Sequence, residues 1–212
     1  MPQTVWIARH GNRLDFVNPE WFNTAERPYD PPLSEDGLIQ AKQLGQRLVG
    51  EGIKHIFASP FLRAVQTANQ VAEALDLPIK LEFGLCEWLN PAWMKTDPER
   101  LPMEMLLVQF PRIDSSYTSC LIPKYPETSE VVVERTAETA RQLTAKFSED
   151  MLLVGHGASV VGTTHGLVGG TPEVNAALCC LVKLVRQEQR WVMELKGDIS
   201  HLSQTEEVIR FN

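Results

Sequence analysis

The chain has 212 residues, which is enough for one domain with a full hydrophobic core. Hydrophobic residues make up 43% and charged residues 22%, as in an ordinary globular protein, and no apolar run approaches the roughly 20 residues of a membrane span. The net charge of -7 disfavours nucleic acid and anionic membranes as partners, so an anionic ligand would need a local cluster of positive charge.

The first half of the chain alternates strand-like and helix-like segments. Residues 4–8 are a short apolar run that predicts a buried strand. After a proline-rich stretch, Ser34 is a good N-cap, and apolar residues at helical spacing follow it. The segment IKHIFAS predicts a second strand, and we expect Ser59 and Pro60 to begin the helix after it.

The second half continues this alternation after an interruption. PIKLEFGL predicts a short strand, and residues 88–126 predict an insertion with one or two short helices. A helix over residues 127–147, a strand at MLLVG, a further helix and a terminal strand pair follow. This order predicts an α/β fold: a three-layer sandwich with a mostly parallel central sheet, helices on both faces, and the insertion (about 88–126) over the active site.

The carboxyl ends of the predicted strands carry polar groups suited to chemistry. In open parallel sheets, ligands bind beyond these ends. A single Arg or Glu there would be an ordinary solvated residue, but a coincidence at four strand ends favours a site. The residues concerned are Arg9, His10 and Arg13 after the first strand, Arg63 after the second, Glu87 after the third and His156 after the fourth.

These residue types predict a phosphate site. Arginines offer rigid, charged forks that match a phosphate bidentately. A neutral imidazole is a nucleophile, and a second, protonated imidazole donates hydrogen bonds to the transferring group. Glu87 is the only nearby candidate for protonating a leaving oxygen. We also expect Gly11 and Gly157, each directly after a histidine, to permit a close approach of the ligand to the backbone.

Four segments resemble, in order, those of the histidine phosphatase superfamily, which includes the cofactor-dependent phosphoglycerate mutases, and a fifth segment supports the resemblance. ARHGNR resembles the RHG signature, SPFLRAVQTA the second arginine motif, GLCEW the segment with the acidic residue, and LLVGHGAS the segment with the second histidine. PETSEVVVERTAET is similar to the helix that begins with Glu-Ser, with Thr128 in place of the serine. The resemblance implies that His10 is the nucleophile and Glu87 the general acid and base, and that the phosphoryl group is bound by Arg9, Arg63 and His156.

Arg13 and GLCEW together resemble one branch of this superfamily: the phosphatase domains of the suppressor of T-cell receptor signalling proteins and the ecdysteroid-phosphate phosphatases. The resemblance implies that Arg13 and Asn12 contact substrate, although Asn12 stands where that branch often has glutamate. Trp88 and Trp93 follow the proposed acid. Packing is the more ordinary role of a tryptophan, but the two could form an apolar wall for an aryl or steroid-like leaving group, and Trp88 is a further candidate for substrate binding.

The predicted function is a phosphomonoesterase that works through a phosphohistidine on His10, with neither metal nor other cofactor. One alternative is a phosphoglycerate-type phosphomutase, although the basic residues of the insertion are scattered rather than clustered. The other is a non-catalytic module that binds a phosphorylated ligand. The expected partner is a small phosphorylated substrate or a phosphate ion, with no nucleic acid and no membrane, and a homodimer through the terminal strand pair stays open.

Domain organisation and location follow from simpler signals. We expect one domain over residues 1–212, because no linker or repeat interrupts the chain. A core-like strand from about Thr4 leaves no room for a signal peptide, and the cysteines form no CxxC pair. Both features predict a cytoplasmic protein with reduced thiols. The cysteines concerned are Cys86, Cys120, Cys179 and Cys180.

Overall fold

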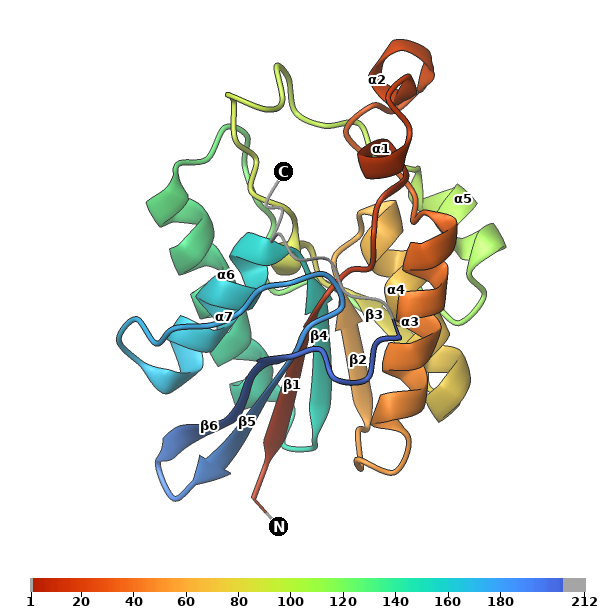
Figure 1. Cartoon of the computed structure of the whole chain (residues 1–212). Coiled ribbons are helices and arrows are strands. Elements are labelled where there is room, and N and C mark those ends of the chain that lie inside the picture. Colours follow the sequence, from red (N-terminus) through yellow and green to blue (C-terminus); the bar gives the residue numbers. More distant parts are fainter. Residues whose placement is uncertain (1, 204–212) are drawn as a thin grey trace.

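The computed structural model describes residues 2–203, and within them six strands form one sheet in the order β3-β2-β4-β1-β5-β6 (Figure 1). The strands β1, β2, β3 and β4 all run parallel to one another. The strand β5 runs antiparallel to β1, and β6 runs antiparallel to β5. The prediction of a mostly parallel sheet with a terminal strand pair is confirmed. The strands are β1 (Thr4–Arg9), β2 (His55–Ala58), β3 (Ile79–Leu81), β4 (Met151–Gly155), β5 (Leu181–Gln187) and β6 (Arg190–Asp198).

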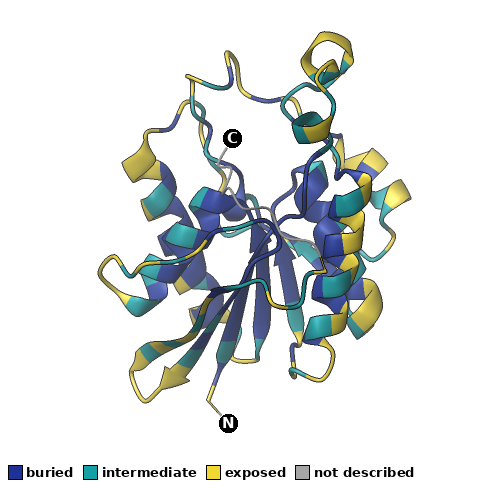
Figure 2. Ribbon diagram, viewed as in Figure 1, coloured by how far each residue is buried: buried dark blue, intermediate teal, exposed yellow. Residues whose placement is uncertain are grey.

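Helices cover both faces of this sheet, as predicted. On one face α3 (Glu35–Leu48) and α4 (Leu62–Leu75) pack together, and on the other α6 (Ser129–Lys146) and α7 (Gly157–Val168) do so. Successive strand residues alternate between the two cores. Ala8 packs on the α3 and α4 side, whereas Ile7 packs on the α6 and α7 side. The central strands β1, β2 and β4 are therefore buried on both faces, whereas β6 at the edge is largely exposed or half-buried (Figure 2).

Short helices lie in the irregular segments. The proline-rich stretch forms α1 (Leu14–Val17) and α2 (Trp21–Thr24), which the sequence did not predict, and they stand above the carboxyl ends of the strands (Figure 1). The insertion holds α5 (Met103–Gln109), and a 3-10 turn, η1 (Phe83–Leu85), follows β3. No helix among the described residues is long and apolar enough to span a membrane.

The start of α4 corrects one prediction. The helix begins at Leu62, and neither Ser59 nor Pro60 lies in it. The backbone N–H of Leu62 donates instead to Asp30 Oδ1 at 2.7 Å. A carboxylate distant in sequence thus satisfies the helix end that Ser59 was expected to cap, and it places negative charge where the helix dipole favours it.

Candidate active site

The predicted site residues come together beyond the carboxyl ends of the parallel strands. The rings of His10 and His156 lie with their centroids 5.2 Å apart. Glu87 Oε2 lies 3.2 Å from Arg63 Nη2 and 3.1 Å from His156 Nδ1. All four side chains are buried. Residues separated by up to 146 positions in the chain therefore form one cluster, because four parallel strands end at the same edge of the sheet.

His10 is held as a neutral imidazole with one nitrogen available. Its Nδ1 lies 2.7 Å from the carbonyl oxygen of Gly11, and a carbonyl only accepts, so Nδ1 carries the proton. Nε2 is buried and has no hydrogen-bond partner among the described residues. Burial, followed by the nearby charge of Arg63, holds the pKa of His10 well below its usual value. The lone pair of Nε2 is therefore free for nucleophilic attack.

Three arginines make this hollow cationic. Burial lowers the pKa of Arg9 to about 10 and also lowers that of Arg63, yet both remain protonated at neutral pH. Arg9 Nη1 donates to the carbonyl oxygen of Ala176 at 2.8 Å. Arg13 forms a bidentate ion pair with Asp15, at 2.9 and 2.5 Å. These buried guanidinium groups would bind a phosphate strongly, since little water competes with them.

Glu87 is ionised in this arrangement. Burial alone would raise the pKa of the carboxyl group, but the contacts with His156 and Arg63 outweigh it and hold the pKa well below its usual value. A general acid needs a proton. A bound phosphate would compete with Glu87 for contacts with Arg63 and His156, and it would add negative charge beside Glu87. Both effects raise the pKa of Glu87. Glu87 could therefore take up the proton that a general acid needs once the substrate is bound.

Ser59 belongs to the site, although the sequence predicts it only as the start of a helix. Its Oγ lies 2.8 Å from His156 Nε2, and both residues are fully buried. Burial lowers the pKa of His156 to about 4 despite the carboxylate of Glu87, so this imidazole is neutral in the free site. From the sequence alone, a protonated imidazole is expected at the second histidine. Ser59 fixes the ring from one side while Glu87 contacts it from the other. The signal was present, because Ser59 directly follows β2, as His10 follows β1.

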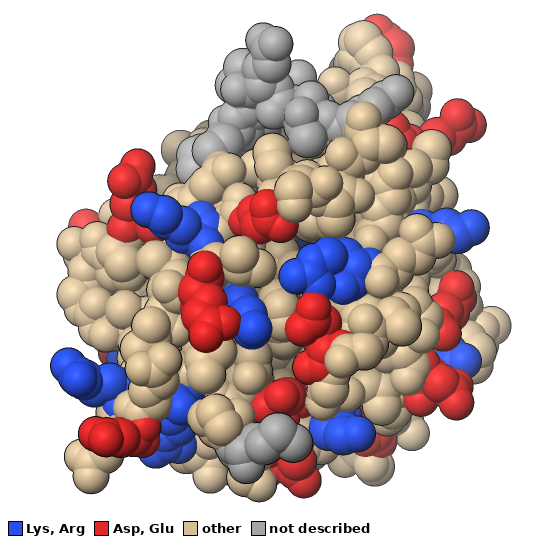
Figure 3. Space-filling model, turned by 60° about the horizontal axis from the view of Figure 1, so that its bottom comes forward, with Lys and Arg blue, Asp and Glu red and all other residues tan. Residues whose placement is uncertain are grey.

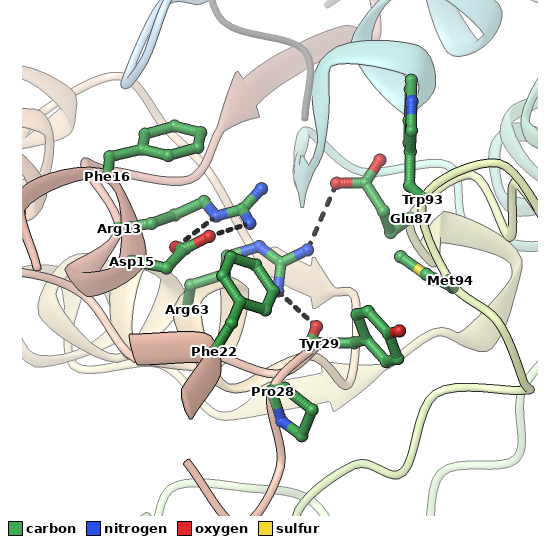
Figure 4. A pocket seen from close by; sticks show the side chains of 10 residues that line it. All are labelled: Arg13, Asp15, Phe16, Phe22, Pro28, Tyr29, Arg63, Glu87, Trp93 and Met94. Atoms are coloured by element: carbon green, nitrogen blue, oxygen red, sulfur yellow. Dashed lines mark hydrogen bonds and ion pairs between the residues drawn. The ribbon is translucent and has the colours of Figure 1, made fainter. Parts of the chain in front are cut away.

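A cavity of about 320 Å³ opens onto Arg63 and Glu87 (Figure 4). Its floor is charged, whereas its upper walls are mostly apolar and come from the segment around α1 and α2 and from the start of the insertion. The insertion thus supplies only part of the cover, and its later part lies beside β3, where Ile113 bridges Ile79. The lining residues are Arg13, Asp15, Phe16, Phe22, Pro28, Tyr29, Arg63, Glu87, Trp93 and Met94.

Two predicted substrate-binding residues do not line this cavity. Asn12 is 2% exposed and does not line the cavity; its Nδ2 donates to Asp36 Oδ2 at 2.7 Å, and its Oδ1 accepts from the backbone of Arg13. It shapes the turn that presents Arg13. Trp88 donates from Nε1 to the carbonyl oxygen of Glu127 and packs against Trp93, with the two ring centroids 5.0 Å apart. Trp93 lines the cavity of Figure 4, and both tryptophans line a second cavity that also reaches Glu87.

The close approach expected of Gly11 also has another cause. A Cβ atom on Gly11 would lie 2.6 Å from the backbone oxygen of Gly37 in α3. Glycine at position 11 therefore lets the loop that carries His10 and Arg13 pack against α3. The structure thus gives this glycine a role in packing within the chain.

His10, Glu87 and His156 also offer ligand atoms that lie within 4.8 Å of one another, which could hold a metal ion. The surroundings do not fit a cation. Arg63 contacts the same carboxylate, and the charges of Arg9 and Arg63 both act on His10. Permanent positive charges at this distance would repel a divalent cation, and they favour an anion.

Comparisons with known proteins agree with this geometry. Residues 5–199 match the model of a family described as histidine phosphatase superfamily (branch 1). The human ubiquitin-associated and SH3 domain-containing protein A is 28% identical over 86% of this chain and 34% of its own length. The ecdysteroid-phosphate phosphatase of Drosophila melanogaster is 28% identical over 79% of this chain and 27% of its own length. The chain therefore spans about a third of the length of these curated relatives.

A solved structure shares the fold. The crystal structure of an ecdysone phosphate phosphatase from Bombix mori, in complex with tungstate, superposes with a TM-score of 0.74 at 21% sequence identity. The match covers 99% of this chain and 98% of that one. The described sheet and its helical layers thus recur in that protein.

Proposed function

The chain belongs to branch 1 of the histidine phosphatase superfamily, and we propose that it is a phosphomonoesterase that forms a phosphohistidine on His10. One observation carries the proposal: His10 Nε2 is buried beside guanidinium groups, unprotonated and without a partner among the described residues. A nucleophile in a cationic hollow is suited to attack on a bound phosphate ester.

The reaction would have two steps. His10 Nε2 attacks phosphorus, the bond from phosphorus to the ester oxygen breaks, and Glu87 gives its proton to the leaving alcohol. Water then attacks the phosphohistidine, Glu87 takes a proton from that water, and the phosphorus–nitrogen bond breaks to release phosphate and His10. The charges of Arg9 and Arg63 offset the negative charge on the phosphoryl oxygens throughout, and no metal is required.

The cavity favours a particular kind of leaving group. Its lining includes the rings of Phe22, Tyr29 and Trp93. Aromatic side chains of this kind stack on flat apolar groups. We therefore propose that the substrate is a small phosphate ester with an aryl or similarly apolar leaving group, of a size that suits about 320 Å³.

The remaining expectations stand as proposals. The described residues share one sheet and its two cores, which supports a single catalytic domain for this chain. On the face drawn in Figure 3, acidic and basic side chains are interspersed, which supports small-molecule rather than nucleic acid binding. A cytoplasmic location rests on the cysteines, which are free thiols. Homodimerisation would use β6, which within residues 2–203 pairs only with β5.

A labelling experiment tests the function. Purified protein is mixed with a ³²P-labelled aryl phosphate and quenched in alkali, where phosphohistidine survives, and the labelled residue is mapped. We expect a burst of label on His10 and steady release of inorganic phosphate. Phosphate binding without label on His10 would favour the non-catalytic module. Isomerisation of 3-phosphoglycerate that outpaces phosphate release would favour the phosphomutase.

A further inference from the structure

Arg135, in the middle of α6, has every one of its five N–H groups engaged. Nη1 donates to the backbone carbonyls of Gly84 at 2.8 Å and Cys86 at 3.2 Å, and Nη2 donates to that of Glu87 at 3.2 Å. Nε and Nη2 also donate to the two carboxylate oxygens of Glu127, at 2.6 and 2.7 Å. A guanidinium group has five such donors in a rigid fork, so none is spare.

Glu127 ties the same segment from its other end. Its Oε2 accepts from the backbone N–H of Leu89 at 3.2 Å, and its own N–H donates to the carbonyl of Leu89 at 2.9 Å. The carbonyl of Glu127 accepts from the indole of Trp88. The buried pair of Arg135 and Glu127 therefore holds the backbone on both sides of Glu87, over residues 84–89.

The segment also packs tightly against α6. A Cβ atom at Gly84 would lie 2.1 Å from Thr139 Oγ1, so the turn before Glu87 lies directly on the helix. Among the described residues, the guanidinium of Arg135 forms no hydrogen bond or ion pair with the carboxylate of Glu87, with His10 or with any other side chain that lines the cavity. Whatever Arg135 does for the site, it does through the backbone.

We infer that Arg135 is the positioning residue for the general acid: it fixes the backbone of residues 84–87 so that the carboxylate of Glu87 lies within reach of both Arg63 and His156. This inference rests on the proposed function. The reason for a buried ion pair here is geometric, since a pair of buried charges adds little net stability. A displacement of about 1 Å in a catalytic group can cost on the order of 10²-fold in rate.

The inference assigns a role to a motif that the mechanism left unused. Glu127 is the first Glu of PETSEVVVERTAET, just before α6, and Arg135 lies eight residues later, on the helix. That spacing brings the two side chains together because Glu127 precedes the first turn of α6 and its side chain meets the fork of Arg135.

The test compares leaving groups in Arg135→Lys. Lysine keeps the positive charge but cannot span three carbonyls and a carboxylate from one nitrogen. The expected loss in kcat/KM is about 10- to 100-fold for an alkyl phosphate, whose leaving oxygen needs a proton, and less than about 3-fold for p-nitrophenyl phosphate, whose leaving group needs none. Glu87→Gln serves as the benchmark and should show the same selectivity to a larger extent.

The matched control is Arg141→Lys on the same helix. Arg141 forms ion pairs with Glu134 and Glu138, and its side chain is 43% exposed. It should leave both kcat/KM values unchanged. Equal slowing of the two esters in Arg135→Lys, or no slowing of either, would overturn the inference. If that variant does not fold, Glu127→Gln, which keeps one acceptor oxygen, is judged by the same ratio.

A second readout does not depend on turnover. Hydrogen exchange at the backbone amides of Trp88 and Leu89 should be faster in Arg135→Lys than in Arg141→Lys, because the segment that carries these amides is no longer held. Unchanged protection there would also overturn the inference. If the native chain released no phosphate from any ester, the proposed function would fail, and the exchange data alone would decide whether Arg135 holds this segment.

Discussion

The floor and the roof of the candidate site are built differently. The floor consists of charged and imidazole side chains from four strand ends, and His10, Arg63, Glu87 and His156 are each at most 4% exposed. The roof includes α1 and α2, neither of which has a buried residue, and Phe22 is 57% exposed. A dry, fully packed floor is preorganised for chemistry, whereas a partly solvated roof suits contact with a variable leaving group.

The largest expected effect lies in the floor. In His10→Ala we expect a loss of turnover of at least about 10⁴-fold, because the second imidazole, that of His156, has Nε2 against Ser59 Oγ and Nδ1 against Glu87 and cannot replace the nucleophile. The affinity for inorganic phosphate should persist, since Arg9 and Arg63 remain. Steady-state kinetics and phosphate titration measure the two quantities. His55→Ala, at a strand start distant from the cavity, is the control, and near-normal turnover in His10→Ala would refute the nucleophile.

A smaller effect is expected at the edge of the floor, in Ser59→Ala. The variant removes the partner of His156 Nε2 but no group that lines the cavity. We expect kcat/KM to fall about 10-fold, and the ¹⁵N signals of His156 to shift. Ser148→Ala, at an exposed serine, is the control. Unchanged imidazole signals would show that Ser59 does not hold the ring.

Substitutions in the roof should change the preference between substrates rather than abolish turnover. In Trp93→Ala we expect kcat/KM for an aryl phosphate to fall about 3- to 10-fold, as for the loss of one aromatic contact, with little change for a small alkyl phosphate. Met105→Ala on α5, outside the cavity, is the control. An equal fall for both esters would place Trp93 with the floor, and the comparison of floor with roof would lose its basis.

The smallest effect concerns stability and pH. Burial depresses the pKa of both His10 and His156, the latter to about 4, whereas an unfolded histidine titrates near 6.5. Below pH 6.5 the unfolded chain therefore takes up protons that the folded chain refuses, and the free energy of unfolding falls by up to about 1.4 kcal/mol per pH unit for each histidine. For His156 this decline ends near pH 4.

Urea unfolding between pH 7 and 5 measures this slope. His156→Gln should make it shallower, because one of the two histidines no longer contributes. Glu87 does not interfere, since its depressed pKa makes its contribution present above about pH 4.5 and lost only below that value. Stability that stays constant or rises on acidification would contradict the burial of neutral imidazoles in the floor.

The sequence by itself determined the strands, their direction and the long helices, although not the short helices α1 and α2. Local signals were sufficient for α3, whose cap Ser34 accepts from Gly37, and for the strands, whose apolar runs are short. Because parallel strands end at one edge, the same signals also predicted which side chains meet in the floor. The superfamily and its ecdysteroid-phosphate phosphatase branch, expected from the motifs, are confirmed by the comparisons.

Only the tertiary structure decided how these residues are held. Asp30 rather than Ser59 caps α4, Trp93 rather than Trp88 lines the cavity, and the contacts with Arg63 and His156 set the ionisation of Glu87. Each of these facts is a contact between segments distant in the chain. Spacing along a helix or strand fixes which face a side chain takes, but the partner it meets there depends on how separate elements pack.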